Sequence, residues 1–139
     1  MNKKTTYIHK VKYYETDKMG ITHHSNYVRW MEEARMDFLR ENNLSYKLLE
    51  KSGIISPVLA INCSYTHTTD FDDEIIIETS VRSYSGVRLE FEYVMKNSAT
   101  GGEVFSGTSK HCFLGSDGTP IILRKMFPEY DKMLKELCE

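Results

Sequence analysis

The feature that most constrains the fold is a single stretch of helical periodicity near the N-terminal third of the chain. Between residues 27 and 40, apolar side chains recur every three or four positions and charged side chains fill the positions between them. The apolar positions are Tyr27, Trp30, Met31, Ala34, Phe38 and Leu39, and the charged positions are Arg29, Glu32, Glu33, Arg35, Asp37 and Arg40. This pattern predicts one long amphipathic helix, capped by Ser25 or Asn26 and ending near Asn42, whose apolar face must pack against another element.

The rest of the chain supplies that element, because it alternates with the period of a strand. Residues 87–95 alternate most clearly, with Val87, Leu89, Phe91, Tyr93 and Met95 on one face. Other strand-like segments are 6–14, 58–68, 74–83 and 103–114, and short helices are expected at 45–51 and 127–138. Successive strands joined by short turns pair in antiparallel fashion. The sequence therefore predicts an α+β fold in which one antiparallel sheet packs around one long helix.

Length and composition limit the domain organisation and the classes of partner. The 139 residues suit one domain that buries its own core without a disulfide. With 18 basic and 20 acidic residues, the net charge of -2 gives no reason to expect a nucleic-acid-binding surface. No apolar run could span a bilayer, no apolar stretch follows the basic N-terminus as in a signal peptide, and the three cysteines are widely spaced. We therefore expect a cytoplasmic protein with reduced thiols.

Residues with reactive side chains gather between the first predicted strand and the long helix. Asp17 precedes Gly20, and His24 precedes the predicted helix start. A helix N-terminus presents free backbone N–H groups and a partial positive charge, which can polarise a carbonyl or stabilise an oxyanion. A nearby carboxylate can act as a general base or nucleophile, and glycine lets the backbone turn tightly. Asp17, Gly20 and the segment 24–27 therefore supply the parts of an acyl-transfer site.

The same residues also have structural interpretations. Asp17 could simply cap a turn. His23 and His24 could bind a metal ion, although adjacent residues in a turn rarely converge on one ion and the chain has no HExxH pattern. Cys63 is more simply explained as a small core residue of a strand than as a nucleophile. From the residues alone, a catalytic and a turn-capping Asp17 are both open.

Residues 13–35, YYETDKMGITHHSNYVRWMEEAR, resemble the N-terminal signature of hotdog-fold acyl-CoA thioesterases of the 4-hydroxybenzoyl-CoA thioesterase type. The matching positions are Tyr14, Glu15, Thr16, Asp17, Gly20, His24, Asn26, Tyr27, Glu32 or Glu33, and Arg35. Residues 56–83, SPVLAINCSYTHTTDFDDEIIIETSVRS, are similar to a second block of that family. The resemblance implies that residues 1–139 form a single hotdog thioesterase domain, a curved antiparallel sheet wrapped around one long central helix.

The resemblance also implies an activity and a set of site residues. The expected reaction is hydrolysis of acyl-CoA or acyl-carrier-protein thioesters without a metal ion or organic cofactor. Asp17 is implied as base or nucleophile, with His24 as a second catalytic candidate and backbone N–H groups near it facing the thioester carbonyl. The implied substrate-binding residues are Tyr14, Gly20, Asn26 and Tyr27.

The family assembles as homodimers or homotetramers with the active sites at subunit interfaces, so we expect a homo-oligomer here. Asp17 of one subunit is then expected near the acidic turn at 70–73, or the strand that begins at Pro57, of the other. Basic residues that could contact the CoA phosphates are Arg82, Arg88 and Lys110. The alternative interpretation is a non-catalytic hotdog module that binds an acyl thioester or a protein partner.

Overall fold

The protein is described by a computed structural model covering residues 2–139. In chain order the elements are β1 (Lys4–Lys10), the 3-10 turn η1 (Tyr13–Glu15), α1 (Asn26–Glu41), α2 (Tyr46–Lys51), β2 (Ile54–Ile55), β3 (Val58–Tyr65), β4 (Glu74–Tyr84), β5 (Arg88–Asn97), β6 (Glu103–Cys112), β7 (Leu114–Gly115), α3 (Leu123–Met126) and α4 (Pro128–Cys138). The long helix and both shorter helical segments expected from the sequence are therefore present.

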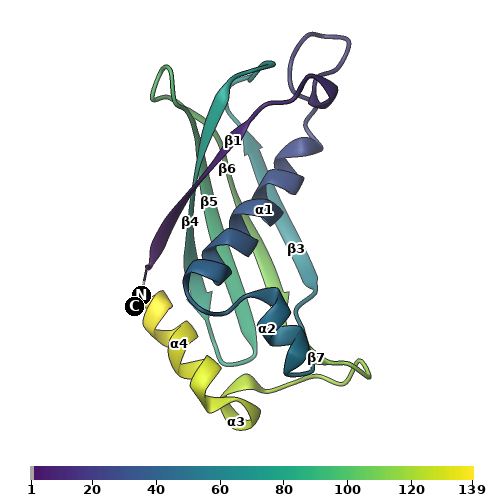
Figure 1. The fold of residues 1–139 in the computed structure, drawn as a ribbon, viewed down its shortest axis with the longest axis vertical. Coiled ribbons are helices and arrows are strands. Elements are labelled where there is room, and N and C mark those ends of the chain that lie inside the picture. The colour runs from purple at the N-terminus through teal and green to yellow at the C-terminus, as the bar shows by residue number, and fades with distance from the viewer. Residues whose placement is uncertain (1) are drawn as a thin grey trace.

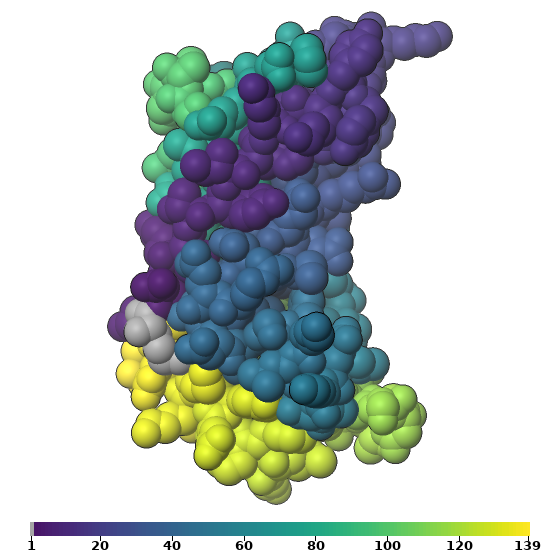
Figure 2. Space-filling model, in the orientation of Figure 1, coloured from purple at the N-terminus to yellow at the C-terminus, as the bar shows by residue number. Residues whose placement is uncertain are grey.

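Five strands form one antiparallel sheet in the order β1-β4-β5-β6-β3, and α1 lies across one face of it (Figure 1). The C-terminal helices α3 and α4 close the end of the molecule away from the start of α1 (Figures 1 and 2). The expectation of successive hairpins is wrong at one connection, because β3 pairs with β6 rather than with β4. The chain after β3 instead runs to the end of β1, where Asp72 and Asp73 exchange backbone hydrogen bonds with Val11.

The core lies between α1 and the sheet and follows the predicted periodicities. Trp30, Ala34 and Phe38 are completely buried on α1, and Phe38 meets Phe91 of β5 edge to face at 5.6 Å. On β5 the alternating residues Leu89, Phe91, Tyr93 and Met95 are all buried, as the alternation predicts. Each such side chain contributes roughly 1.5–3 kcal/mol by leaving water. The helix and sheet are thus held together by the two patterns that were visible in the sequence.

The first strand is shorter than predicted, because it ends at Lys10 and the chain then forms η1. The Glu15 side chain accepts a hydrogen bond from the Lys12 backbone N–H at 2.8 Å, and the Glu15 N–H donates to the Lys12 carbonyl at 2.9 Å. This reciprocal pair turns the chain away from the sheet. Tyr13 and Tyr14, which were expected in the strand, are consequently exposed to solvent.

Arg35 is the second departure, because it was expected on the polar side of the helix and is instead 95% buried. Its Nε donates to the Tyr46 hydroxyl at 3.0 Å and its Nη1 to the Tyr93 hydroxyl at 3.1 Å. The Tyr93 hydroxyl lies 2.6 Å from Ser109 Oγ, which lies 2.7 Å from His111 Nε2. Hydroxyl partners make burial of this cation tolerable, since buried polar groups must be hydrogen-bonded.

The buried His111 makes the stability of the fold sensitive to acid. Burial, and secondly the positive charge of Arg35, lowers the pKa of His111 from 6.5 to about 4. Between those values the unfolded chain binds more protons than the folded one, so the free energy of unfolding should fall as the pH decreases from about 6.5 to about 4. The contribution of this one group is on the order of 3 kcal/mol. Urea unfolding at a series of pH values measures it.

The control for this prediction is His111→Gln, which keeps a hydrogen-bonding group beside Ser109 but does not titrate. Its free energy of unfolding should change less steeply with pH over the same window. Equal slopes for the two proteins would contradict the assignment to His111. Glu15, whose pKa is below its ordinary value, contributes with the same sign, but only as the pH falls through that lowered pKa.

Two further features bear on the expectations from composition. No helix within residues 2–139 is both long enough and apolar enough to cross a membrane. Cys63, Cys112 and Cys138 are free thiols. Cys63 is half-buried on β3 and packs against the core, as expected of a small strand residue.

Candidate active site

The loop between η1 and α1 is closed at its base and projects past the start of α1 (Figure 1). Thr16 and Thr22 form an isolated antiparallel bridge. Within the loop, the Asp17 N–H donates to the Ile21 carbonyl at 2.9 Å and the Gly20 N–H donates to the Asp17 carbonyl at 3.0 Å. Gly20 has a φ of +77°, a conformation that favours glycine. The sequence TDKMGIT is therefore a tight turn that holds Asp17 on one limb of the loop.

Asp17 is half-buried and caps this turn. Its Oδ1 accepts a hydrogen bond from the Met19 N–H at 2.8 Å, so the structural interpretation of Asp17 is geometrically correct. That bond occupies one carboxylate oxygen. Within residues 2–139 no hydrogen bond reaches Oδ2. The turn thus orients the carboxylate and leaves one oxygen free for a proton or a carbonyl carbon.

The start of α1 lies on the other limb of the loop. The Asn26 side-chain amide donates to the Glu15 carbonyl at 2.9 Å and to the His23 carbonyl at 3.2 Å. The His23 N–H donates to the Glu15 carbonyl at 2.8 Å, and the Ser25 N–H donates to the His23 imidazole at 3.2 Å. In the described chain no acceptor meets the N–H of His24, which lies between them. This is a free donor at the helix N-terminus, where a developing negative charge is favoured.

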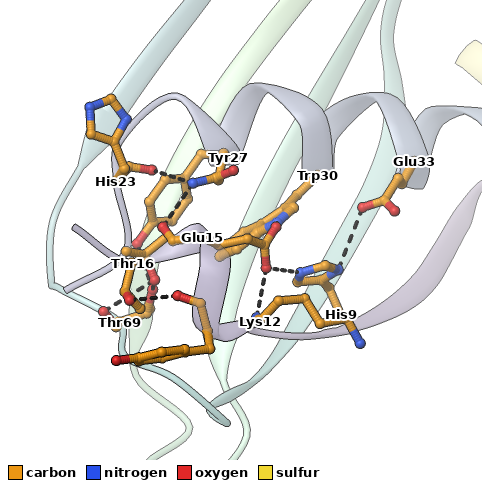
Figure 3. A network of polar contacts seen from close by, with 12 residues as sticks. His9, Lys12, Glu15, Thr16, His23, Tyr27, Trp30, Glu33 and Thr69 are labelled. Carbon is orange, nitrogen blue, oxygen red and sulfur yellow. Dashed lines mark hydrogen bonds and ion pairs between the residues drawn. The ribbon is translucent and has the colours of Figure 1, made fainter. Parts of the chain in front are cut away.

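Glu15 connects the two limbs (Figure 3). One carboxylate oxygen lies 2.8 Å from His9 Nε2 on β1 and 2.8 Å from the Lys12 N–H, and the other accepts from Trp30 Nε1 on α1 at 2.8 Å. Burial raises the pKa of this carboxyl group, but the hydrogen bonds from His9, Lys12 and Trp30 outweigh burial and hold it below its ordinary value. Glu15 is therefore a buried carboxylate that stays ionised at neutral pH.

A cavity of about 440 Å³ opens beside the helix start, between α1 and the end of β3. Its lining residues are Ile21, Thr22, His24, Tyr27, Tyr65, Thr66, His67 and Thr68. Tyr27 is buried, with its hydroxyl 2.8 Å from Thr69 Oγ1, and Thr69 Oγ1 lies 2.6 Å from Thr22 Oγ1. The Tyr65 hydroxyl donates to the His24 carbonyl at 3.1 Å. Partial desolvation, and secondly the neighbouring Cys63, raises the pKa of Tyr65 to about 12, so its hydroxyl is a neutral donor.

A second cavity, of about 470 Å³, lies further along α1, where the chain enters β3. Its lining residues are Glu32, Arg35, Met36, Tyr46, Glu50, Ile54, Ile55, Ser56, Pro57 and Val58. Arg35 is a buried cation in the lining of this cavity. Among the described residues, no carboxylate lies within ion-pair distance of it. Both cavities therefore lie between α1 and the chain of β3, one near the loop at Tyr27 and the other roughly two helical turns further along at Arg35.

The structure brings some of the predicted site residues together and separates others. His24 and Tyr27 line the first cavity, and Gly20 shapes the loop beside it. The Asn26 side chain is buried and bonded to backbone carbonyls, so it fixes the loop and does not face the cavity. Tyr14 is 82% exposed and lies toward a different hollow, shared with Lys12.

The structure also locates the histidine pair considered for a metal ion and the basic residues considered for the CoA phosphates. The His23 and His24 rings stand 4.3 Å apart, and His23 Nδ1 lies 2.8 Å from Ser25 Oγ. Across residues 2–139 no group of three or more His, Cys, Asp or Glu is arranged to hold a metal ion. Arg88 and Lys110 line one hollow of about 450 Å³, whereas Arg82 is paired with Glu90 at 3.8 Å.

Sequence reasoning missed three contributors to this region. Glu15 was part of the matching motif, but nothing assigned it a role. Tyr65 ends β3 and Thr69 lies in the chain after it, and both are more than 40 residues from the loop residues that they contact, His24 and Thr22. A lone tyrosine or threonine in a strand-like segment carries no signal of such a contact.

Comparison with known proteins places these features in context. A family model described as the thioesterase-like superfamily matches residues 11–136. The putative acyl-CoA thioesterase YneP of Bacillus subtilis is 35% identical over 123 residues, which cover 87% of this chain and 88% of that protein. The 4-hydroxybenzoyl-CoA thioesterase of a Pseudomonas species is 22% identical over 107 residues, covering 75% of this chain and 76% of that protein. The solved structure of the DHNA-CoA thioesterase from Staphylococcus aureus superposes with a TM-score of 0.91 at 31% identity, covering 96% of this chain and 90% of that one.

Proposed function

The chain belongs to the thioesterase-like superfamily and is a thioester hydrolase of the hotdog fold, and from this premise we propose that it hydrolyses acyl-CoA thioesters with Asp17 as base or nucleophile. The backbone N–H of His24 is the proposed donor to the thioester carbonyl. One observation carries the proposal: a carboxylate with an unpaired oxygen and a helix-terminal N–H without a partner belong to the same closed loop.

The proposed chemistry needs only these groups and water. As base, Asp17 removes a proton from the water that attacks the thioester carbon; as nucleophile, its oxygen attacks and water then hydrolyses the anhydride. In both routes negative charge develops on the carbonyl oxygen and is stabilised by the His24 N–H and the α1 N-terminus. Breaking of the C–S bond then expels the thiolate, which takes up a proton. In the nucleophile route this step forms the Asp17 anhydride, and water hydrolyses it afterwards.

For the acyl group we propose an aromatic ring, as in the DHNA-CoA that names the Staphylococcus aureus enzyme. Aromatic side chains support this proposal, because Tyr27 and Tyr65 line the cavity next to the loop, 5.3 Å apart and edge to face.

We further propose that the active protein is a homodimer in which the exposed edge of β3 meets its copy. Among the described residues β3 pairs only with β6, so its other edge is unpaired, and several of its apolar side chains are exposed. Val58, Leu59, Ile61 and Tyr65 are each 44–50% exposed. An apolar unpaired edge of this kind is a surface that proteins normally cover. Because both cavities border β3, a partner there would complete their walls.

The test of the proposed function is release of free thiol from a panel of acyl-CoAs, followed with a thiol-trapping dye. We expect turnover of hydroxyaroyl-CoAs with kcat/KM roughly 10- to 200-fold above that of straight-chain acyl-CoAs of similar size, the range that a complementary pocket supplies. Equal kcat/KM for the two classes would contradict the aromatic assignment and leave thioester hydrolysis intact. No thiol release from any acyl-CoA would contradict the CoA substrate, and acyl-carrier-protein thioesters would then be tested in the same assay.

A further inference from the structure

Glu15 is the most heavily hydrogen-bonded side chain next to the loop, yet the proposed chemistry gives it no task. It is 5% exposed, so substrate cannot approach its carboxylate. A buried carboxylate is costly unless donors surround it, and here three donors do so, from β1, from the backbone before η1 and from α1. Packing alone does not require an ionised group at this position, because an apolar side chain would fill the same space.

The backbone of the same residue holds the opposite limb of the loop. The Glu15 carbonyl accepts from the His23 N–H at 2.8 Å and from the Asn26 amide at 2.9 Å. Asp17 follows Glu15 by two residues, and His24 follows His23 by one. A shift of Glu15 would therefore move Asp17 and the His24 N–H relative to each other.

We propose that Glu15 is a positioning residue for thioester hydrolysis, whose ionised side chain fixes the distance between the Asp17 carboxylate and the His24 N–H. This inference rests on the proposed function. Small displacements of reacting groups are sufficient to lower turnover strongly, because the reacting atoms must sit close together and aligned. Here the Glu15 side chain is bonded to β1 and α1, and the Glu15 backbone is bonded to the opposite limb of the loop. The positions of both limbs therefore depend on Glu15.

The charge of Glu15, rather than its size, is the property that matters. A carboxylate accepts hydrogen bonds at both oxygens, whereas a glutamine offers one acceptor oxygen and one NH₂ group. In Glu15→Gln the NH₂ group would face either Trp30 Nε1 or the Lys12 N–H, which are both donors. One of the two bonds is then lost and the loop must shift.

A double-mutant cycle tests the proposal, with kcat and KM measured for the wild type, Glu15→Gln, Asp17→Asn and the double variant. We expect Glu15→Gln to lower kcat by roughly 10- to 100-fold with little change in KM, and to lower it no further when Asp17 is already asparagine, since residues that act as a unit are non-additive. A residue that only stabilises the fold would reduce kcat by the same factor in both backgrounds. That result, or an unchanged kcat in Glu15→Gln, overturns the proposal.

Two additional variants keep the test decisive. Glu33→Gln removes the other carboxylate near His9 and should leave kcat unchanged. The Glu33 side chain is 46% exposed, and its Oε2 lies 3.5 Å from His9 Nδ1. If Glu15→Gln does not fold, Trp30→Phe removes a single donor to Glu15 and keeps an aromatic ring; it should lower kcat by a smaller factor with the same non-additivity. A fully active Asp17→Asn would instead overturn the proposed role of Asp17, so failure of the proposed function is distinguishable from failure of this inference.

Discussion

Replacing Asp17 by asparagine is expected to lower kcat by roughly 10² to 10⁴-fold, the usual contribution of a positioned acid–base group. The substitution removes the negative charge and keeps the shape of the side chain. The amide oxygen of asparagine can still accept the hydrogen bond from the Met19 N–H, so the turn is retained. Thiol release measures kcat, and urea unfolding measures whether the fold is affected.

The chain offers a matched control in Asp117. Its Oδ1 accepts a hydrogen bond from the N–H two residues later, Thr119, at 3.0 Å, which is the same turn geometry as at Asp17. Asp117→Asn should therefore leave kcat unchanged. Near-normal turnover in Asp17→Asn would place the chemistry elsewhere in the molecule. An equal loss in both variants would mean that the turns, and not the acid at Asp17, govern activity.

The elements that could be predicted from the sequence are those in which one face is buried. The period of α1 and the alternation of β5 are visible because burial selects every third or fourth residue in one and every second residue in the other. The end of β1 could not be predicted, since the run of tyrosines at 13–14 suits a strand and the turn there depends on Glu15. The pairing of β3 with β6 is likewise invisible in any local pattern, because sheet order is set by tertiary packing.

The same limit applies to the candidate site. Asp17, Gly20 and His24 are close in sequence, so a motif could indicate them together. Arg35 was assigned to the polar face because of its charge, whereas its partners Tyr46 and Tyr93 lie 11 and 58 residues away in the chain. A buried cation whose hydrogen-bond partners are distant in the chain produces no periodic pattern in the sequence. Sequence therefore locates the proposed chemistry, and only the fold locates the groups that hold it in place.

The second large effect is expected at the exposed edge of β3. Ile61 lies in the middle of that strand and is 44% exposed. In a two-fold pairing of β3 with its copy, Ile61→Lys would bring two like charges into an apolar interface, and lysine on an edge strand is a device by which proteins prevent such pairing. We expect this variant to be a monomer of about the chain mass, 16.2 kDa, by light scattering at low micromolar concentration, and we expect the unmodified protein to be a dimer or larger there.

Activity should fall when the assembly is lost, because the proposed site borders the interface. We expect a loss of at least 10-fold in kcat/KM, on the order of 1.4 kcal/mol of transition-state stabilisation. Ile8→Lys is the matched control. Ile8 is 56% exposed on β1, the opposite edge strand of the same sheet, so this variant should keep both its assembly and its activity. A dimeric Ile61→Lys would place the interface elsewhere, and a fully active monomer would show that one chain forms a complete site. Loss of assembly in both variants would instead indicate that the two edges of the sheet are each covered in the oligomer, as a tetramer requires.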